Sequence, residues 1–385
     1  MSRFLRVLGL GIVCLIAMPS FGQKPRARDL GLKPGVFAPG KMNAITDVAS
    51  VKVGQVTLIE GNNIRTGVTA ILPHGGNLFQ DKVAGGVFVG NAFGKLAGST
   101  QVNELGQIET PIVLTNTLSV GTAVQAVVSY TLGVPGNERV MSVNAVVGET
   151  NDWYLNDIRG LHVTNQHVID AIQKASDGPV QEGTVGAGTG TIAFNWKGGI
   201  GTSSRVLPKE FGGFMVGVLV QTNFGGILTM GGTPVGKETG RYAYRQNDAN
   251  KPSAGPGNGS CMIVIATDAP VDGRGLQRLA ARGVYALGRT GSDYANGSGD
   301  FAIAFSTSPA MRTHPDEVAP HAQTVLPPEA MSPLFEAVLE ATEEAVYNSM
   351  LQATTVTTKF GNETHVGQEI PVDKVREILS RYGIK

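Results

Sequence analysis

The chain has 385 residues, of which 42% are hydrophobic and 16% charged, and its formal net charge is zero. This apolar fraction excludes a disordered chain, and the length is sufficient for one large α/β domain or two smaller ones. No basic tract stands out, so nucleic acid is not an expected partner. The 52 glycines indicate many tight turns and close backbone approaches.

The N-terminus is typical of an export signal. Residues 1–6 are basic, residues 7–18 are apolar, and the small residues Ser20 and Gly22 predict cleavage before Gln23, which makes residues 1–22 the signal peptide. A membrane anchor is the alternative, but the apolar run is short for a span and polar sequence follows it. We therefore expect a periplasmic or secreted protein that has no membrane segment once the signal is removed.

Segments rich in valine, isoleucine and threonine predict strands, and apolar residues at helical spacing predict helices. A basic arm at 24–41 is expected to be extended. Strands and helices occur in separate runs, which favours sheets covered by helices over a regular βαβ array. Ser332 is expected to cap the last long helix, with Pro333 at its first position. The predicted strands are 51–59, 67–72, 86–89, 140–147, 214–221, 260–267 and 301–306, and the predicted helices are 117–132, 163–175, 276–287, 332–350 and 372–382.

Two segments stand out by their composition. Residues 183–205 are rich in glycine, and Gly186, Gly188 and Gly190 resemble part of a nucleotide-binding loop. The loop lacks the Walker lysine and the full dinucleotide spacing, so a glycine loop that approaches another backbone is the favoured interpretation. Residues 237–258 are polar, contain glycine and proline, and form the expected linker.

Common catalytic motifs are absent from the sequence. No serine has lysine three positions later, no serine has glycine at both −2 and +2, and there is no His-Glu-x-x-His. The six histidines are scattered, and no cysteine and histidine have zinc spacing. A metal site is therefore not expected.

The junction Gly259-Ser260 places flexible residues directly before a strongly apolar run. A serine hydroxyl can attack the carbonyl of its own preceding residue, and glycine there obstructs least. Cleavage of the resulting ester by water would leave Ser260 as a new N-terminus. Its hydroxyl would be the nucleophile and its α-amine, with a pKa of about 7.7–8.0, a built-in general base. An ordinary serine at the start of a strand is the alternative.

Eight segments along most of the mature chain resemble the N-terminal-serine aminopeptidases, which include the bacterial L-aminopeptidase/D-amidase/esterase and the β-peptidyl aminopeptidases. The resemblance implies a precursor that cuts itself into an α chain, 23–259, and a β chain, 260–385, which together form one catalytic domain. It also implies an α/β fold, a four-layer αββα sandwich similar to the N-terminal nucleophile hydrolases, and a homo-oligomer, often a tetramer of αβ units. The segments are ARDLGL (27–32), NAITDVASVKVG (43–54), ETPIVLTNTLSVG (109–121), VVGETND (146–152), GAGTGT with GGIGTSSR (186–205), VLVQTNFG (218–225), NGSCMIVIATDAP (258–270) and NGSGDFAIAFST (296–307).

The same resemblance implies catalytic roles. Ser260 matches the nucleophile, and Ser298 and Asp300 match the serine and carboxylate beside it. The β-peptide enzymes of the family have glutamate where this chain has the shorter Asp300. The sequence therefore does not determine which group the Asp300 carboxylate contacts. Asn223 matches the side chain that helps form the oxyanion hole, where loss of a donor commonly slows the reaction about 100–1,000-fold. The alternatives are a polar hairpin at 296–300 and a turn-forming asparagine.

Two further residues are expected to contact substrate. Glu149 matches the carboxylate that receives the free amine of the substrate, with a solvated loop acid as the alternative. Asn151 lies where some relatives have a tyrosine that donates a hydrogen bond to the oxyanion. In this chain, backbone N–H groups are expected to donate that hydrogen bond instead.

The resemblance implies a hydrolase that releases the N-terminal residue of short peptides, amides or esters through an acyl-enzyme on Ser260, without a metal or organic cofactor. The exported N-terminus resembles that of the β-peptide enzymes of the family, and this resemblance favours β-amino-acid substrates. The alternatives are an L-aminopeptidase/D-amidase/esterase that prefers α-amino acids, an acyltransferase similar to the ornithine acetyltransferases, and an uncleaved binding protein. Ornithine acetyltransferases use threonine inside the cell, which disfavours that alternative.

Overall fold

The computed structural model describes residues 24–245 and 259–385. The predicted signal peptide therefore lies outside the described residues, as does most of the predicted linker. At the start of that linker, Lys237 and Glu238 belong to a short helix, α4 (Val235–Glu238). Within the described ranges, no helix is both long and apolar enough to cross a membrane.

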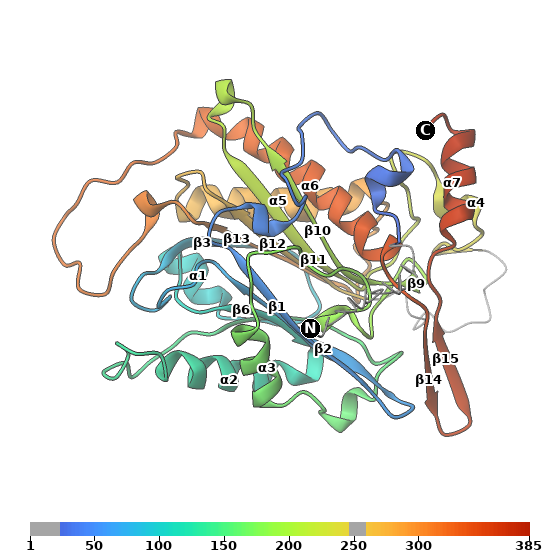
Figure 1. The fold of residues 1–385 in the computed structure, drawn as a ribbon, viewed down its shortest axis with the longest axis horizontal. Helices are drawn as coiled ribbons and strands as arrows, with labels where there is room; N and C mark the ends of the chain where they lie inside the picture. Colours follow the sequence, from blue (N-terminus) through green and yellow to red (C-terminus); the bar gives the residue numbers. More distant parts are fainter. Residues whose placement is uncertain (1–23, 246–258) are drawn as a thin grey trace, which may run out of the picture.

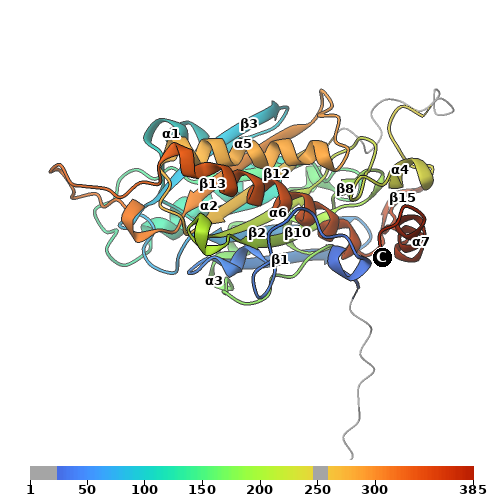
Figure 2. The same cartoon turned by 90° about the horizontal axis from the view of Figure 1, so that it is seen from above.

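Two sheets stack face to face and a pair of helices covers each outer side (Figure 1). Helices α2 (Val120–Leu132) and α3 (Asn165–Gln173) pack on the first sheet, and α5 (Gly273–Arg289) and α6 (Ser332–Leu351) pack on the second, where they lie side by side (Figure 2). This order of layers confirms the predicted αββα sandwich.

The first sheet has five strands and the second has six. In the first sheet the spatial order of the strands is β1 (Lys52–Glu60), β2 (Ile64–Leu72), β6 (Ile112–Asn116), β7 (Val146–Thr150), β4 (Leu96–Ala97). In the second sheet the order is β10 (Gly199–Val206), β11 (Met215–Thr222), β12 (Cys261–Thr267), β13 (Gly299–Ser306), β3 (Val83–Ala92), β5 (Gln107–Ile108). Smaller elements are α1 (Ser99–Leu105), α7 (Val372–Arg381) and the two-stranded pairs β8 (Ile192–Ala193) with β9 (Trp196–Lys197) and β14 (Val356–Phe360) with β15 (Glu363–Gly367).

Strand β12 lies in the middle of the second sheet and is buried on both faces. Ile263 and Ile265 belong to the core beneath α5 and α6, whereas Met262 and Val264 belong to the core between the sheets. Successive side chains of a strand point to opposite faces, so a strand between two apolar layers needs a continuous apolar run. This explains the unbroken hydrophobic sequence after Ser260.

Some predicted boundaries are wrong. The strand expected at 140–147 begins only at Val146 and continues to Thr150. Ser332 is the first residue of α6 and not its cap, because a 3₁₀ turn, Pro328–Met331, runs directly into the helix. The residue in the cap position is Met331, which has helical dihedrals and no side-chain oxygen, so the helix start has no side-chain capping hydrogen bond.

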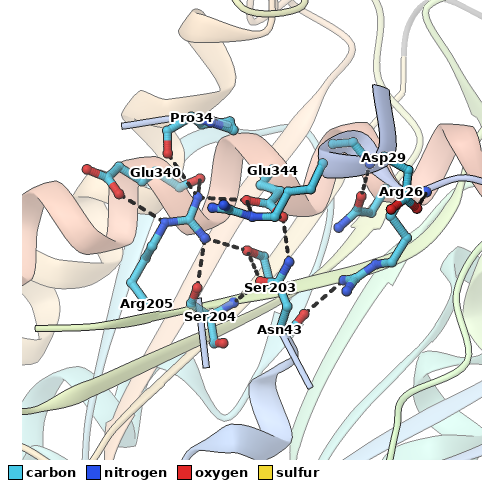
Figure 3. A network of polar contacts seen from close by, with 12 residues as sticks. Arg26, Asp29, Pro34, Asn43, Ser203, Ser204, Arg205, Glu340 and Glu344 are labelled. Carbon is cyan, nitrogen blue, oxygen red and sulfur yellow. Dashed lines mark hydrogen bonds and ion pairs between the residues drawn. The ribbon is translucent and has the colours of Figure 1, made fainter. Parts of the chain in front are cut away.

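The segment predicted as an extended arm is instead anchored to the second sheet and α6. Ala27 and Leu30 lie in a 3₁₀ turn and are buried. Figure 3 shows the polar network behind them, centred on Arg205 of β10. The Arg205 guanidinium is fully buried, and it contacts Glu340 at 2.9 Å and Glu344 at 2.8 Å, both on α6. The N-terminal segment joins this network through Arg28, whose Nε lies 3.0 Å from Glu344.

The glycine-rich segment packs against neighbouring backbone, which confirms the favoured interpretation of that loop. A Cβ atom at Gly67 would overlap the backbone oxygen of Gly186, and one at Gly199 would overlap that of Gly183. Glycine at these positions lets the loop lie directly on β2 and β10.

Candidate active site

The predicted site residues meet at one end of the two sheets. Ser260 directly precedes β12, and Cys261 pairs with Thr222 of antiparallel β11 and with Asp300 of parallel β13. The end of β11 and the beginnings of β12 and β13 therefore share one edge. Asn223 follows β11, and its backbone N–H donates to the Ser260 carbonyl at 2.9 Å.

The junction before Ser260 accepts only glycine. A Cβ atom at Gly259 would overlap the backbone oxygen of Asn223 and lie 2.6 Å from its side-chain nitrogen. The Gly259 backbone is therefore pressed against the side chain predicted to bind an oxyanion. The Ser260 hydroxyl is buried and accepts a hydrogen bond from the Gly299 N–H at 3.1 Å.

Ser298 connects the Gly259 carbonyl to Asp300. Its hydroxyl makes a short hydrogen bond to the Gly259 oxygen, and it lies 2.9 Å from Asp300 Oδ1. A serine hydroxyl has one proton, so it cannot donate to both oxygens at once. When it donates to Gly259, the contact with Asp300 is favourable only if the carboxyl is protonated and donates to Ser298.

The surroundings of Asp300 favour its protonated form. Its side chain is fully buried, and Oδ2 has no hydrogen-bond partner among the described residues. Burial raises the pKa of Asp300 to about 6, although the hydrogen bond with Ser298 lowers it in part.

The side-chain amide of Asn223 is fixed at both ends. Its Oδ1 accepts from the Ile192 N–H at 2.9 Å, and its Nδ2 donates to the Asn151 carbonyl at 3.0 Å. One Nδ2 proton is committed to that carbonyl, and the second is available to another acceptor. The Asn151 side chain instead accepts from the Trp153 N–H at 3.1 Å.

Glu149 comes from β7 of the other sheet and is buried. One carboxylate oxygen accepts from the Lys95 backbone N–H at 2.9 Å, and the other accepts from the Thr117 hydroxyl. The Lys95 ammonium lies 4.0 Å away. Burial raises the pKa of Glu149, while Thr117 and Lys95 act in the opposite direction.

A cavity of about 300 Å³ joins these groups. Ser260, Glu149 and Asn151 line it, so the structure brings together a serine hydroxyl and a buried carboxylate in one cavity. Asn223, Ser298 and Asp300 do not line the cavity. Asn223 and Ser298 contact the backbone at 259–260, and Asp300 contacts Ser298. The described residues contain no group of three or more metal-ligating side chains.

Sequence reasoning missed several residues of the cavity and its support. Phe93, Lys95 and Thr117 line the cavity. Only Thr117 lay in a segment that carried the family resemblance, and nothing in its spacing marked it as a partner of Glu149.

A buried lysine also supports the site and was not expected. Lys197 Nζ is fully buried and donates at 2.8 Å to the carbonyls of Gly188 and Gly198. Burial lowers the pKa of Lys197 to about 7 and raises that of the neighbouring Asp152 to about 7. This lysine holds together the loop that presents Ile192 to Asn223.

Comparisons with known proteins identify the family of the chain. Residues 43–364 match the model of peptidase family S58. The chain is 41% identical to the β-peptidyl aminopeptidase BapA of Sphingosinicella microcystinivorans, over 96% of this chain and 95% of the relative. A solved β-aminopeptidase of Burkholderia sp. is 37% identical with a TM-score of 0.83, covering 94% of this chain and 100% of that one. The L-aminopeptidase D-Ala-esterase/amidase of Ochrobactrum anthropi, a variant of the Ntn hydrolase fold, is 37% identical with a TM-score of 0.85, covering 94% and 99%.

Proposed function

The chain belongs to peptidase family S58 and is a hydrolase that acts on peptides, and on that premise we propose that it is a self-processing β-peptidyl aminopeptidase. It releases N-terminal β-amino acids from short peptides, amides or esters. One observation carries the proposal: the Ser260 hydroxyl and the Glu149 carboxylate line the same cavity. A nucleophile and an anionic site at that position suit a substrate with a free amine near its reacting carbonyl.

The nucleophile arises by self-cleavage. Ser260 Oγ attacks the Gly259 carbonyl carbon and forms an ester. The C–N bond breaks, and the hydroxyl proton passes to the nitrogen, which becomes the Ser260 α-amine. Water then hydrolyses the ester and frees the α chain, 23–259, from the β chain, 260–385. The hydroxyl of Ser298 donates to the Gly259 oxygen, and a protonated Asp300 orients it, so developing negative charge is stabilised where it forms.

The mature enzyme uses the same serine on substrate. The free α-amine of Ser260 takes the hydroxyl proton, the hydroxyl attacks the substrate carbonyl, and the amine returns the proton to the leaving nitrogen. The uncommitted N–H of Asn223 stabilises the oxyanion. Glu149 binds the substrate ammonium, and its burial strengthens that attraction relative to water. Internal peptide segments lack the ammonium and are excluded.

The preference for β-amino acids follows the relative named as a β-peptidyl aminopeptidase, at 41% identity. The second candidate, an aminopeptidase for α-amino acids, is favoured by the Ochrobactrum neighbour. We also propose export by residues 1–22 to the periplasm or medium, and assembly into a homo-oligomer of αβ units.

The test combines intact mass under denaturing conditions with a substrate pair. We expect two fragments from the wild type, divided between Gly259 and Ser260, and one chain from Ser260→Ala. The control Ser380→Ala, at an exposed serine of α7, should be cut like the wild type. Hydrolysis of β-homoalanyl p-nitroanilide faster than L-alanyl p-nitroanilide supports the β preference. A single intact chain from active wild type would contradict the mechanism.

A further inference from the structure

The cavity contains a cation beside its buried anion. Among the described residues that line the cavity, Lys95 is the only one with a positively charged side chain. Its ammonium lies 4.0 Å from Glu149 Oε1, and 55% of its side chain is exposed, against 2% for Glu149. The two opposite charges therefore stand next to each other at different depths.

The Lys95 ammonium is not needed to satisfy Glu149. Both carboxylate oxygens already accept hydrogen bonds, one from the Lys95 backbone N–H and one from the Thr117 hydroxyl. At 4.0 Å the ammonium is beyond hydrogen-bond distance of that oxygen, and it donates to no acceptor among the described residues. Its three N–H donors can therefore bind an anion in the cavity.

Neighbouring sites for a cation and an anion fit a substrate that carries both charges close together. In a β-amino acid the amine is attached to the second carbon from the reacting carbonyl. If that same carbon also carries a carboxylate, the residue is an aspartate linked through its side-chain carbonyl. Its ammonium can face Glu149 while its free α-carboxylate faces Lys95.

We propose that the pair formed by Glu149 and Lys95 recognises isoaspartyl peptides, in which aspartate is joined through its β-carboxyl group. The inference rests on the proposed aminopeptidase function and names a substrate class for it. Attack of Ser260 on the β-carbonyl breaks the C–N bond, and the leaving nitrogen takes a proton as the amine of the shortened peptide. Water then hydrolyses the ester and releases free aspartate.

The experiment compares two substrates that differ only at the group facing Lys95. One is L-isoaspartyl p-nitroanilide, and the other is β-homoalanyl p-nitroanilide, which has a methyl group in place of the carboxylate. We expect the wild type to cleave both. In Lys95→Met the ratio of kcat/KM for the isoaspartyl substrate to that for the β-homoalanyl substrate should fall about 10-fold, mainly through KM, because an ion-assisted contact is lost at a half-exposed site. Lys95→Arg keeps the charge and should keep most of the ratio.

The matched control is Lys174→Met, at an exposed lysine just after α3 that does not line the cavity, and it should leave the ratio at its wild-type value. Equal losses on both substrates in Lys95→Met would show that Lys95 acts through Glu149 and would overturn the inference. Wild-type cleavage of the β-homoalanyl substrate alone would overturn the inference while leaving the proposed function intact. Cleavage of neither substrate by self-processed protein would overturn both.

Discussion

In the self-cleavage proposed here, one buried group, Asp300, controls the reaction through its protonation state. Because burial raises its pKa to about 6, the carboxyl is protonated below that pH and charged above it. The charged form draws the Ser298 proton to itself and away from the Gly259 carbonyl. The self-cleavage proposed here thus depends on an acid that most surface aspartates could not supply at the same pH.

Self-cleavage of the wild type is therefore expected to slow as the pH rises through about 6. In Asp300→Asn the side chain keeps a neutral N–H donor at every pH, so this decline should disappear. The rate is measured from the fraction of cut chain on denaturing gels between pH 5 and pH 8. A wild-type rate that increases throughout this range would be inconsistent with a protonated Asp300 as the donor.

Glu149→Gln should lower kcat/KM for amine-bearing substrates by about 100-fold, mostly through KM. The reason is that a neutral amide cannot balance the substrate ammonium in a buried site, and loss of one partner of a buried charge pair costs about 2–5 kcal/mol. Steady-state kinetics on β-homoalanyl p-nitroanilide measures the effect. Glu104→Gln, at an exposed position of α1, is the control. An unchanged KM in Glu149→Gln would remove this residue from amine binding.

Gly259 and Ser260 could be recognised in the sequence because a serine directly after a glycine can attack the carbonyl of that glycine. The contacts of Glu149 with Thr117 and Lys95 could not be predicted in the same way. They join strand β7 to segments 54 and 32 residues away, through hydrogen bonds that depend on how the chain is folded. The protonated state of Asp300 likewise depends on burial, which no spacing reveals.

At the scale of elements, the joint between the N-terminal segment, β10 and α6 depends on Arg205. Arg205→Ala should lower the free energy of unfolding by about 3–5 kcal/mol, because it takes the Arg205 partner from the buried Glu340 carboxylate and leaves the buried Glu344 paired with Arg28 alone. The control is Arg376→Ala, whose ion pair with Asp373 is more than half exposed at both partners and should contribute less than about 1 kcal/mol. Urea unfolding of both variants measures the difference. Equal losses would mean that the Arg205 network adds little to stability.

Elements with strong patterns were predictable and short ones were not. Strand β12 has a continuous apolar run and helix α5 has apolar residues at helical spacing. Both patterns can be recognised in the sequence without knowledge of the neighbouring elements. The two-residue strands β4 and β5 have no pattern of their own, and they exist because longer strands offer them partners. The start of α6 depends on the preceding 3₁₀ turn, which a capping pattern centred on Ser332 does not describe.

At the scale of the molecule, the proposed cut falls inside a single sheet. Strand β12 of the β chain pairs with β11 of the α chain on one side and with β13 on the other, and β3 of the α chain pairs with β13 in turn. Both chains also share the core between the sheets. The layered fold itself was predictable through the family resemblance, whereas the order of the strands required the structure.

Because the strands of the two chains alternate in one sheet, the cut protein should refold by a different route from the uncut precursor. The uncut chain folds by a unimolecular process, whereas two separated chains must first find each other and then insert β12 and β13 between β11 and β3. Refolding of the mature protein from urea should therefore depend on protein concentration, while refolding of Ser260→Ala should not, and intrinsic fluorescence followed at several protein concentrations measures both. The peptide bond between Gly259 and Ser260 would then be needed only for the first folding of the chain, after which the molecule keeps a structure that its two separated fragments reach far more slowly.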